Sequence, residues 1–258
     1  MSSLLRHTRR SAGGAPAAHV TLDDGVLRAH AHPCPGVPAM ASIVVLDGAV
    51  VPTPAHYRRW GAHLQQLGFT HLRTGALAPR LAAQATQAGL VPVQELVLLE
   101  LTHPNRVRRS RSAQRATRTT SLERGHLGLA SALDRAAFGD RWWLDAGMLG
   151  EVCEATPRIR ARAIADSGSI DPHGGFLISG RAGRIGYIQR LAVHPEHQRA
   201  GRATALMDDA LAWMHRRRVE RVFVNTHADN AAALALYDRY GFVALRERLA
   251  VFEGVIAP

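Results

Sequence analysis

Lysine is absent from this chain of 258 residues, so arginine supplies all 32 of its lysine-plus-arginine residues. The formal net charge is +11 at pH 7. Without lysine the chain cannot form a mononucleotide-binding loop that ends in Gly-Lys-Ser/Thr, because that loop holds the phosphates with its lysine. The excess of positive charge favours an anionic ligand or partner, but by itself it does not indicate nucleic acid.

Cysteine is scarce as well. The two cysteines, Cys34 and Cys153, lie far apart in the sequence and match no spacing of a metal site. This usage predicts a reduced, cytoplasmic protein. His30 and His32 precede Cys34 closely, but a lone cluster of this kind in a proline-rich stretch is more often a plain loop. We therefore predict a loop there and no metal.

Long apolar runs are missing too. None approaches the ~20 residues that cross a bilayer, although hydrophobic residues make up 47% of the chain. The composition predicts a globular protein with a core and without a membrane partner. The first twenty residues are basic and small and lack an apolar central segment, so we expect no signal peptide. Residues 1–40 are predicted to be disordered or irregular.

The densest basic run, RVRRSRSAQRATR, covers Arg106–Arg118. One interpretation is an arm that binds nucleic acid. No aromatic residue interleaves with these arginines, so no platform for stacking bases is visible. We favour a solvated linker over residues 106–120 and do not expect nucleic acid as a partner.

Beyond this linker, helix and strand patterns alternate with short connections. The predicted elements are helices at Leu127–Phe138 and Asp145–Glu154, strands at Ile159–Ala165, Gly175–Arg181 and Arg184–Val193, a helix to about Arg216, a strand at Arg221–Thr226, a helix over AAALALYDRY and a closing strand over FVALRERLAVF. Such alternation predicts a layered α/β or α+β domain.

The chain also aligns with itself when it is shifted by 152 positions. RTGALAPRLAAQATQAGLVPVQEL (Arg73–Leu96) then lies on NTHADNAAALALYDRYGFVALRER (Asn225–Arg248) without a gap, and both segments share the order helix, glycine, strand. An ancestral duplication is the interpretation that we favour, with residues 41–105 as a smaller, degenerate copy. Two unrelated but similar α/β units are the alternative.

The stretch HPEHQRAGRATAL (His194–Leu206) joins a strand pattern to a helical run. A small-residue loop that opens a helix can direct several backbone N–H groups at one point, and the helix dipole adds positive potential there. We therefore expect an anion to bind at this loop. Because GxGxxG is absent, the loop is not a dinucleotide-binding fingerprint.

The strand and helix patterns around this loop carry a family resemblance. LAVHPEHQRAGRATAL, followed by VNTHADNAAALALYDRYGF, resembles the GNAT superfamily of acyl-CoA-dependent N-acyltransferases, and within it the ribosomal-protein N-terminal acetyltransferases. The resemblance covers about Ser121–Glu253. It implies an α+β fold with a mixed central sheet flanked by helices, a GNAT domain over residues 121–258, and acetyl-CoA as co-substrate without a metal.

The resemblance also implies roles for individual residues. The backbone of the strand before the loop would pair with the pantetheine arm, and the loop would hold the pyrophosphate. Tyr237 would be the catalytic residue that protonates the departing CoA thiolate, with core packing as its alternative role. The expected cofactor-binding residues are Leu191, Ala192, Val193, Gln198, Arg199, Ala200, Gly201, Arg202, Ala203, Thr204, Asn225 and Asn230.

One position departs from the family. Close relatives carry a glutamate as general base where this chain has Asn225, and an amide cannot take a proton at neutral pH. An α-amino group, with a pKa of about 7.7–8.0, loses its proton more readily than a lysine side chain, with a pKa of about 10.4. The departure therefore favours an α-amine, another amine of low pKa, or a base elsewhere, for which His227 and Glu247 are candidates.

In the duplicated register Asn225, Asn230 and Tyr237 fall on Arg73, Ala78 and Ala85. We therefore predict that the first copy is catalytically empty.

Together these features predict an acetyl-CoA-dependent N-acetyltransferase with direct transfer to a primary amine. The amine is either a protein N-terminal α-amine or that of a small molecule. No cysteine lies where a covalent intermediate would need it. A CoA-sensing or partner-binding module without turnover is the alternative, because Asn225 removes the expected base. The sequence does not decide whether the protein forms a homodimer.

Overall fold

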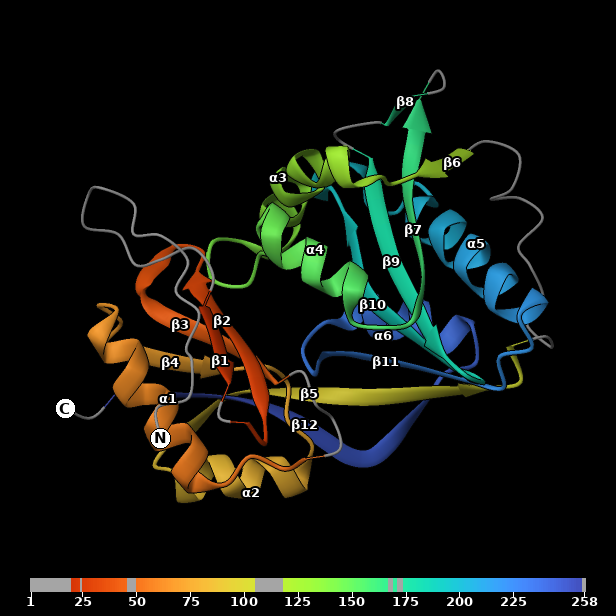
Figure 1. Ribbon diagram of the computed structural model, residues 1–258. Coiled ribbons are helices and arrows are strands. Elements are labelled where there is room, and N and C mark those ends of the chain that lie inside the picture. The colour runs from red at the N-terminus through yellow and green to blue at the C-terminus, as the bar shows by residue number, and fades with distance from the viewer. Residues whose placement is uncertain are drawn as a thin grey trace. The chain divides into compact units, whose positions relative to one another are not determined.

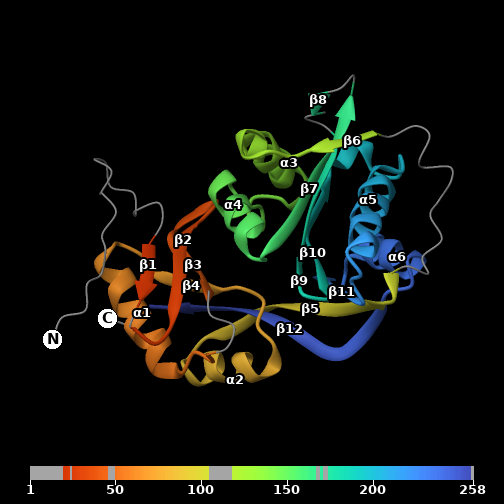
Figure 2. The ribbon, with the colours of Figure 1, turned by 45° about the vertical axis from the view of Figure 1, so that its right-hand side comes forward.

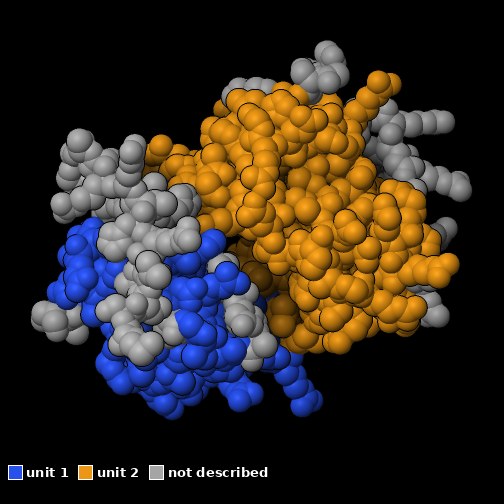
Figure 3. Space-filling view, in the orientation of Figure 1, with its two compact units in different colours: residues 1–97, 246–258 blue, residues 98–245 orange. Residues whose placement is uncertain are grey.

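The computed structural model describes residues 20–23, 25–45, 50–104, 118–166, 169–170 and 174–256. Figure 1 shows its helices and strands. The chain forms two compact units, coloured separately in Figure 3. Unit 1 comprises residues 1–97 and 246–258, and unit 2 comprises residues 98–245.

Unit 1 contains a sheet with the strand order β1-β2-β3-β4-β12 and two helices. Strands β3 and β4 are parallel, and the other neighbours in this order are antiparallel. The elements are β1 (Val20–Asp23), β2 (Arg28–Cys34), β3 (Val37–Val45), α1 (Pro54–Gln66), β4 (His71–Thr74), α2 (Pro79–Gln87) and β12 (Val243–Val255).

The core of unit 1 lies between the sheet and its helices. Helix α1 begins at Pro54, whose fixed φ suits the first helical position. Its buried face presents Trp60 and Leu64, which pack with small strand residues such as Ala31 and Ala41. The alanines on the sheet leave room for the large indole, and larger strand residues such as Ile43 and Leu72 complete the same core.

The prediction of a disordered or irregular segment over residues 1–40 is wrong for residues 20–40. Within this range β1 covers residues 20–23, β2 covers residues 28–34 and β3 begins at residue 37, whereas Asp24 and residues 1–19 lie outside the described residues. The buried positions of β2 include Ala29 and Ala31, each fully shielded from solvent. Alanine gives a weak period-2 signal, so the alternation that marks a strand is hard to see.

Unit 2 contains the strand order β5-β11-β10-β9-β7-β6, and β8 pairs with β7. Its elements are β5 (Val91–Thr102), β6 (Arg118–Ser121), α3 (Leu127–Phe138), α4 (Ala146–Glu154), β7 (Arg158–Asp166), β8 (Ser169–Ile170), β9 (Gly175–Ala182), β10 (Ile185–Val193), α5 (Arg202–Arg216), β11 (Arg221–His227) and α6 (Ala231–Arg239). Of β5, only the residues from Leu98 belong to this unit.

Helices cover both faces of the unit 2 sheet (Figure 2). Leu133 of α3 and Leu149 of α4 pack with Phe176 and Ile178 of β9 on one face. On the other face α5 packs closely against β10 at Gly186, which has no side chain. A Cβ at this position would lie only 2.8 Å from Met214 Sδ of α5. The predicted α+β fold with a mixed sheet flanked by helices is confirmed.

The predicted linker is only partly described. Residues 118–120 belong to strand β6, which pairs with β7 in antiparallel fashion. Residues 105–117, which hold most of the basic run, lie outside the described residues.

The duplicated register agrees with the positions of the elements. Adding 152 to the bounds of α2, 79 and 87, gives 231 and 239, the bounds of α6. Adding 152 to 91, the first residue of β5, gives 243, the first residue of β12. The two units also share a strand arrangement. In unit 1 the antiparallel pair β2-β3 is followed in the sheet by β4, which is parallel to β3. In unit 2 the antiparallel pair β9-β10 is followed by β11, which is parallel to β10.

The units differ from the predicted domains because each receives its last strand from the other half of the chain. Strand β12 follows α6, yet Glu253 in its second half pairs with Arg73 of β4 in unit 1. The end of β5 follows α2, yet Glu100 forms an ion pair with Arg221 of β11 in unit 2. The predicted boundaries, 41–105 and 121–258, follow the chain and miss this exchange.

Candidate functional site

The parallel strands β10 and β11 separate part of the way along their length. They pair only over Ile185–Tyr187 with Arg221–Phe223. Beyond this point β10 continues to Val193 and β11 to His227, and no further ladder pair joins them in the described part of the chain. The facing backbone N–H and C=O groups of the separated ends are therefore available to a ligand.

The corresponding strands of unit 1 stay together. Strands β3 and β4 pair from Met40 with His71 to Ile43 with Thr74, which is the last residue of β4. The amide N–H of Gly75 then donates to the carbonyl of Ile43 at 3.2 Å. No gap like that between β10 and β11 opens between these two strands among the described residues.

A β-bulge lies where β10 leaves β11. The register between β10 and β9 shifts between Ile188 and Arg190, so Gln189 is the extra residue. The Gln189 side chain donates from Nε2 to the carbonyl of Val152 in α4 at 3.0 Å. The bulge sets the direction of the following segment, Leu191–Val193, which is the segment predicted to pair with the pantetheine arm.

The loop after β10 contains two residues in the left-handed region. Arg199 has φ 62° and Gly201 has φ 78°. A residue other than glycine costs roughly 1–2 kcal/mol in this conformation. Left-handed residues in such a loop turn successive N–H groups toward one concavity, which suits an anion. Strain of this kind is typical of functional loops.

Helix α5 begins directly after this loop, with Gly201 as its N-cap. Glycine has no side chain to cap the first turn, and no side-chain cap is present. The N–H groups of the first turn and the dipole of this 15-residue helix therefore face the loop. Arg199 is exposed and Arg202 is partly buried there.

Helix α6 carries the predicted Asn230 and Tyr237. Asn230 is its N-cap, and its Oδ1 accepts from the amide of Ala233 at 3.0 Å. Tyr237 is 4% exposed and packs against Phe242, with 5.5 Å between ring centroids. Burial raises the pKa of the Tyr237 hydroxyl well above its usual value, so this hydroxyl holds its proton at neutral pH.

Tyr240 has more than a packing role. Its hydroxyl donates to Asp208 Oδ1 at 2.8 Å and lies 3.0 Å from the carbonyl oxygen of Thr204. Burial and the neighbouring Asp208 carboxylate raise the pKa of Tyr240. This contact joins the end of α6 to the first turns of α5. The YGF pattern indicates packing alone, so sequence reasoning missed the hydrogen bond.

Asn225 lies in the separated part of β11 and is exposed. His227, two residues further, accepts at Nδ1 from the amide of Asp229 at 3.2 Å. Glu247 is exposed and belongs to unit 1. Both remain only candidate bases.

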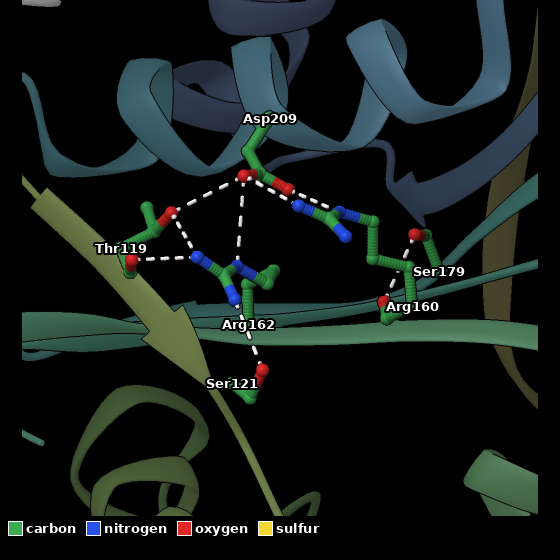
Figure 4. Close-up of polar contacts among 6 residues, drawn as sticks. All are labelled: Thr119, Ser121, Arg160, Arg162, Ser179 and Asp209. Carbon is green, nitrogen blue, oxygen red and sulfur yellow. Dashed lines mark hydrogen bonds and ion pairs between the residues drawn. The ribbon is translucent and has the colours of Figure 1, made fainter. Parts of the chain in front are cut away.

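A charged network around Asp209 holds α5 to the sheet (Figure 4). Arg160 of β7 donates from Nε to Asp209 Oδ1 at 2.5 Å and from Nη2 to Oδ2 at 3.0 Å. Arg162 Nε lies 3.5 Å from Oδ2, to which Thr119 of β6 donates at 3.2 Å. Burial alone would raise the pKa of Asp209, but these donors and positive charges together lower it below its usual value.

We expect Asp209→Asn to lower the free energy of unfolding at pH 7 by about 2 kcal/mol, because an amide leaves two partly buried arginines without a counter-charge. A depressed pKa means that the carboxylate stabilises fully above the pKa of unfolded aspartate and loses this effect as the pH falls through the folded pKa. In thermal unfolding, the difference between wild type and variant should therefore narrow below about pH 4.

The control is Asp140→Asn, which removes the ion pair between Asp140 and Arg135. The Asp140 side chain is 69% exposed. Exposed pairs contribute little, so this variant should unfold like the wild type. Equal stability of Asp209→Asn and wild type at pH 7 would contradict the role given to the network.

The interpretation of His30, His32 and Cys34 as a loop is wrong, because all three lie in strand β2. His32 and Cys34 are buried there. Across the described ranges, no cluster of three or more His, Cys, Asp or Glu side chains is arranged to hold a metal ion. None of the described helices is long and apolar enough to span a membrane.

Parts of the sequence match known acetyltransferases. Residues 159–242 match the family described as Acetyltransferase (GNAT) family. Mycothiol acetyltransferase of Saccharomonospora viridis is 37% identical over 62 residues, which are 24% of this chain and 19% of that protein. [Ribosomal protein bS18]-alanine N-acetyltransferase of Escherichia coli is 38% identical over 52 residues, 20% of this chain and 35% of that protein.

N-alpha-acetyltransferase 30 of Schizosaccharomyces pombe is 39% identical over 57 residues, 22% of this chain and 38% of that protein. The matched segments thus span between a fifth and two fifths of these relatives.

Solved structures resemble the chain over most of its length. A tandem GNAT protein from the clavulanic acid biosynthesis pathway has a TM-score of 0.62 at 16% identity, and the match covers 95% of this chain and 85% of that one. A GCN5-related N-acetyltransferase from Kribbella flavida has a TM-score of 0.59 at 15% identity, with 92% and 89% covered. At these identities the likeness shows the fold, and the family match over 159–242 shows that the chain carries a GNAT acetyltransferase domain.

Proposed function

We propose that the chain is an acetyl-CoA-dependent N-acetyltransferase that transfers the acetyl group directly to a primary amine. The observation that carries this proposal is the separation of β10 from β11 beside the uncapped N-terminus of α5. A ligand that fits there needs a long arm to lie between two strand edges and an anionic group to lie at a helix N-terminus. A CoA thioester has both.

The chain's residues fit such a ligand. Unpaired backbone edges of Leu191–Val193 can pair with the pantetheine amides, and the strained loop can hold the pyrophosphate. Arg199 and Arg202 can add charge-assisted bonds to phosphate. The proposed cofactor-binding set is Leu191, Ala192, Val193, Gln198, Arg199, Ala200, Gly201, Arg202, Ala203, Thr204, Asn225 and Asn230.

When bound, acetyl-CoA supplies the acetyl thioester that the amine attacks. Backbone N–H groups of Leu191–Val193 polarise the thioester carbonyl. The C–N bond would form as the C–S bond breaks, and Tyr237 would give its proton to the departing sulfur. The surplus proton on the new amide nitrogen would pass to solvent water, from which the Tyr237 oxygen would recover its own. The raised pKa of Tyr237 keeps the hydroxyl protonated at neutral pH, as a proton donor must be, although it also makes the hydroxyl a weaker acid. Asn225 takes no proton, so the acceptor must arrive as a neutral amine.

The requirement for a neutral amine favours an acceptor of low pKa. An α-amino group is the natural candidate, because a larger fraction of it is neutral at pH 7 than of a lysine side chain. The relatives are named for both a protein alanine and mycothiol. We therefore keep protein N-terminal amines and small-molecule amines as the two acceptor classes, in a cytoplasmic protein.

The proposal is tested by thiol release from acetyl-CoA against a panel of amines. The panel contains peptides with a free N-terminus, the same peptides with a blocked N-terminus and a free lysine, and small amines. We expect turnover with the free N-termini or the small amines, and little with the blocked lysine peptides. Tight binding of CoA without turnover on any amine would favour the alternative, a CoA-sensing module, for which Asn225 is the supporting observation.

We further propose that unit 1 is a degenerate copy that binds no CoA. Its parallel strands β3 and β4 pair to the end of β4, which leaves no separated edges for a pantetheine arm. Isothermal titration with CoA should therefore give one site per chain. A stoichiometry of two would contradict the empty copy.

A further inference from the structure

Arg190 lies at the bulge of β10 and makes a forked ion pair with Asp134 of α3. Its Nε donates to Asp134 Oδ1 at 2.7 Å and its Nη2 to Oδ2 at 2.5 Å. The Asp134 side chain is fully buried, and that of Arg190 is 17% exposed. Two parallel bonds of this kind fix direction as well as distance.

The same pair also joins the connection between α3 and α4. Arg190 Nη2 donates to the carbonyl of Trp142 at 2.9 Å, and Asp134 Oδ2 accepts from the amide of Leu144 at 2.7 Å. The Arg190 guanidinium also lies over the ring of Phe138, 3.6 Å from its centroid. The Arg190 guanidinium thus points toward α3, and these contacts hold the Arg190 side chain in a single conformation.

The bulge determines which face of the sheet Arg190 reaches. Gln189 contacts α4 and Arg190 contacts α3, so two consecutive side chains lie on the same face. In a regular strand successive side chains alternate between faces. Without the bulge, Arg190 would point to the face that carries α5, and Asp134 would lose its partner. The ion pair therefore stabilises the bulged register over the regular one.

A strand that slips by one residue turns every following side chain and backbone group. The residues that follow the bulge are Leu191–Val193, whose N–H groups we assign to the thioester. We propose that Arg190 and Asp134 are positioning residues that hold this segment in the register needed to polarise the acetyl carbonyl. This inference rests on the proposed function, and neither side chain contacts the acetyl group itself.

The test uses the full chain with two variants. Arg190→Lys keeps the charge but loses the fork. The double variant Arg190→Met/Asp134→Leu removes both charges together, so no buried charge is left without a partner. Its melting temperature, measured beside that of the wild type, shows whether it folds. Arg135→Met is the matched control, because Arg135 lies on the same helix in an exposed ion pair with Asp140.

The readout is the infrared carbonyl stretch of acetyl-CoA labelled with carbon-13 at the acetyl carbonyl. Wild type and Arg135→Met should lower this frequency on binding, because hydrogen bonds weaken the C=O bond. In both Arg190 variants the band should return toward its position in water. Affinity for CoA without the acetyl group should stay within about threefold by calorimetry, whereas kcat should fall roughly 10²-fold, as for one lost oxyanion donor.

The failures of the two proposals are distinguishable. A wild-type chain that binds no acetyl-CoA overturns the proposed function, and this inference with it. A wild-type chain that binds acetyl-CoA without lowering the carbonyl frequency overturns the role of the segment after the bulge. A lowered frequency that persists in the folded double variant overturns the inference alone.

Discussion

Gly201→Glu should reduce the affinity for CoA by at least about 100-fold, the equivalent of losing one or two charge-assisted hydrogen bonds to phosphate. Gly201 has φ 78° and directly precedes the first turn of α5. The substitution sets a carboxylate where the pyrophosphate should lie, and it favours a change in backbone conformation that would turn the N–H groups away. Isothermal titration with CoA measures the change.

A matched control separates the charge at the loop from the backbone strain. Gly183, in the turn between β9 and β10, is exposed and also has a positive φ, 56°. A Cβ at either glycine meets no atom within 4 Å, so neither substitution causes a clash at its β-carbon. Gly183→Glu should therefore show a similar strain and an unchanged CoA affinity. Equal affinities of Gly201→Glu and wild type would remove the loop from the CoA site.

Local patterns predicted the two helices α3 and α4 of unit 2 closely. Helix α3 has the predicted bounds, Leu127–Phe138, and α4 begins after Asp145, which was predicted as its first residue and is its N-cap. Helix α4 also has a strong N-terminal signal, because Asp145 Oδ1 accepts from the Met148 amide at 2.8 Å. Where the periodic and capping signals agree, single-sequence reasoning is reliable.

The exchange of last strands could not be predicted. The segments around Val91 and Val243 read as strands, and both are strands. The pattern of a strand specifies which of its faces is buried but not which strand it pairs with. Strands pair through backbone hydrogen bonds, which do not depend on the identity of the side chains. The duplication makes this ambiguity acute, since two similar last strands can pair with either of two similar edges.

The bulge and its ion pair were also missed, although the sequence holds a trace of them. In IGYIQRLAV two polar residues, Gln189 and Arg190, interrupt an apolar strand. Alternation would place one of them in the core, and a bulge places both on the face of α3 and α4. The partner Asp134 lies 56 residues earlier, on a helix whose apolar pattern gives no reason to expect a buried carboxylate. Pairings of this kind come from tertiary structure alone.

Tyr237→Phe should lower kcat about 10²-fold, near the lower end of what a general acid contributes. The substitution removes one oxygen and leaves the ring, which packs against Phe242. CoA affinity should therefore change little. Because burial raises the pKa of Tyr237 well above its usual value, the hydroxyl is protonated throughout the neutral range. The loss in kcat should for this reason stay constant between about pH 6 and 9.

Tyr57→Phe is the matched control for this prediction, because Tyr57 is equally buried, at 4% exposed, but lies on α1 in unit 1. Tyr240→Phe is unsuitable, because it removes the hydroxyl that donates to the buried Asp208 carboxylate and should cost about 1–3 kcal/mol of stability. Rates are compared at saturating acetyl-CoA and acceptor, beside melting temperatures. If Tyr237→Phe turns over like Tyr57→Phe, Tyr237 has no part in the chemistry. If the melting temperature of Tyr237→Phe falls together with its kcat, Tyr237 has a packing role instead. Loss of a proton donor alone slows the departure of the thiolate but does not destabilise the fold.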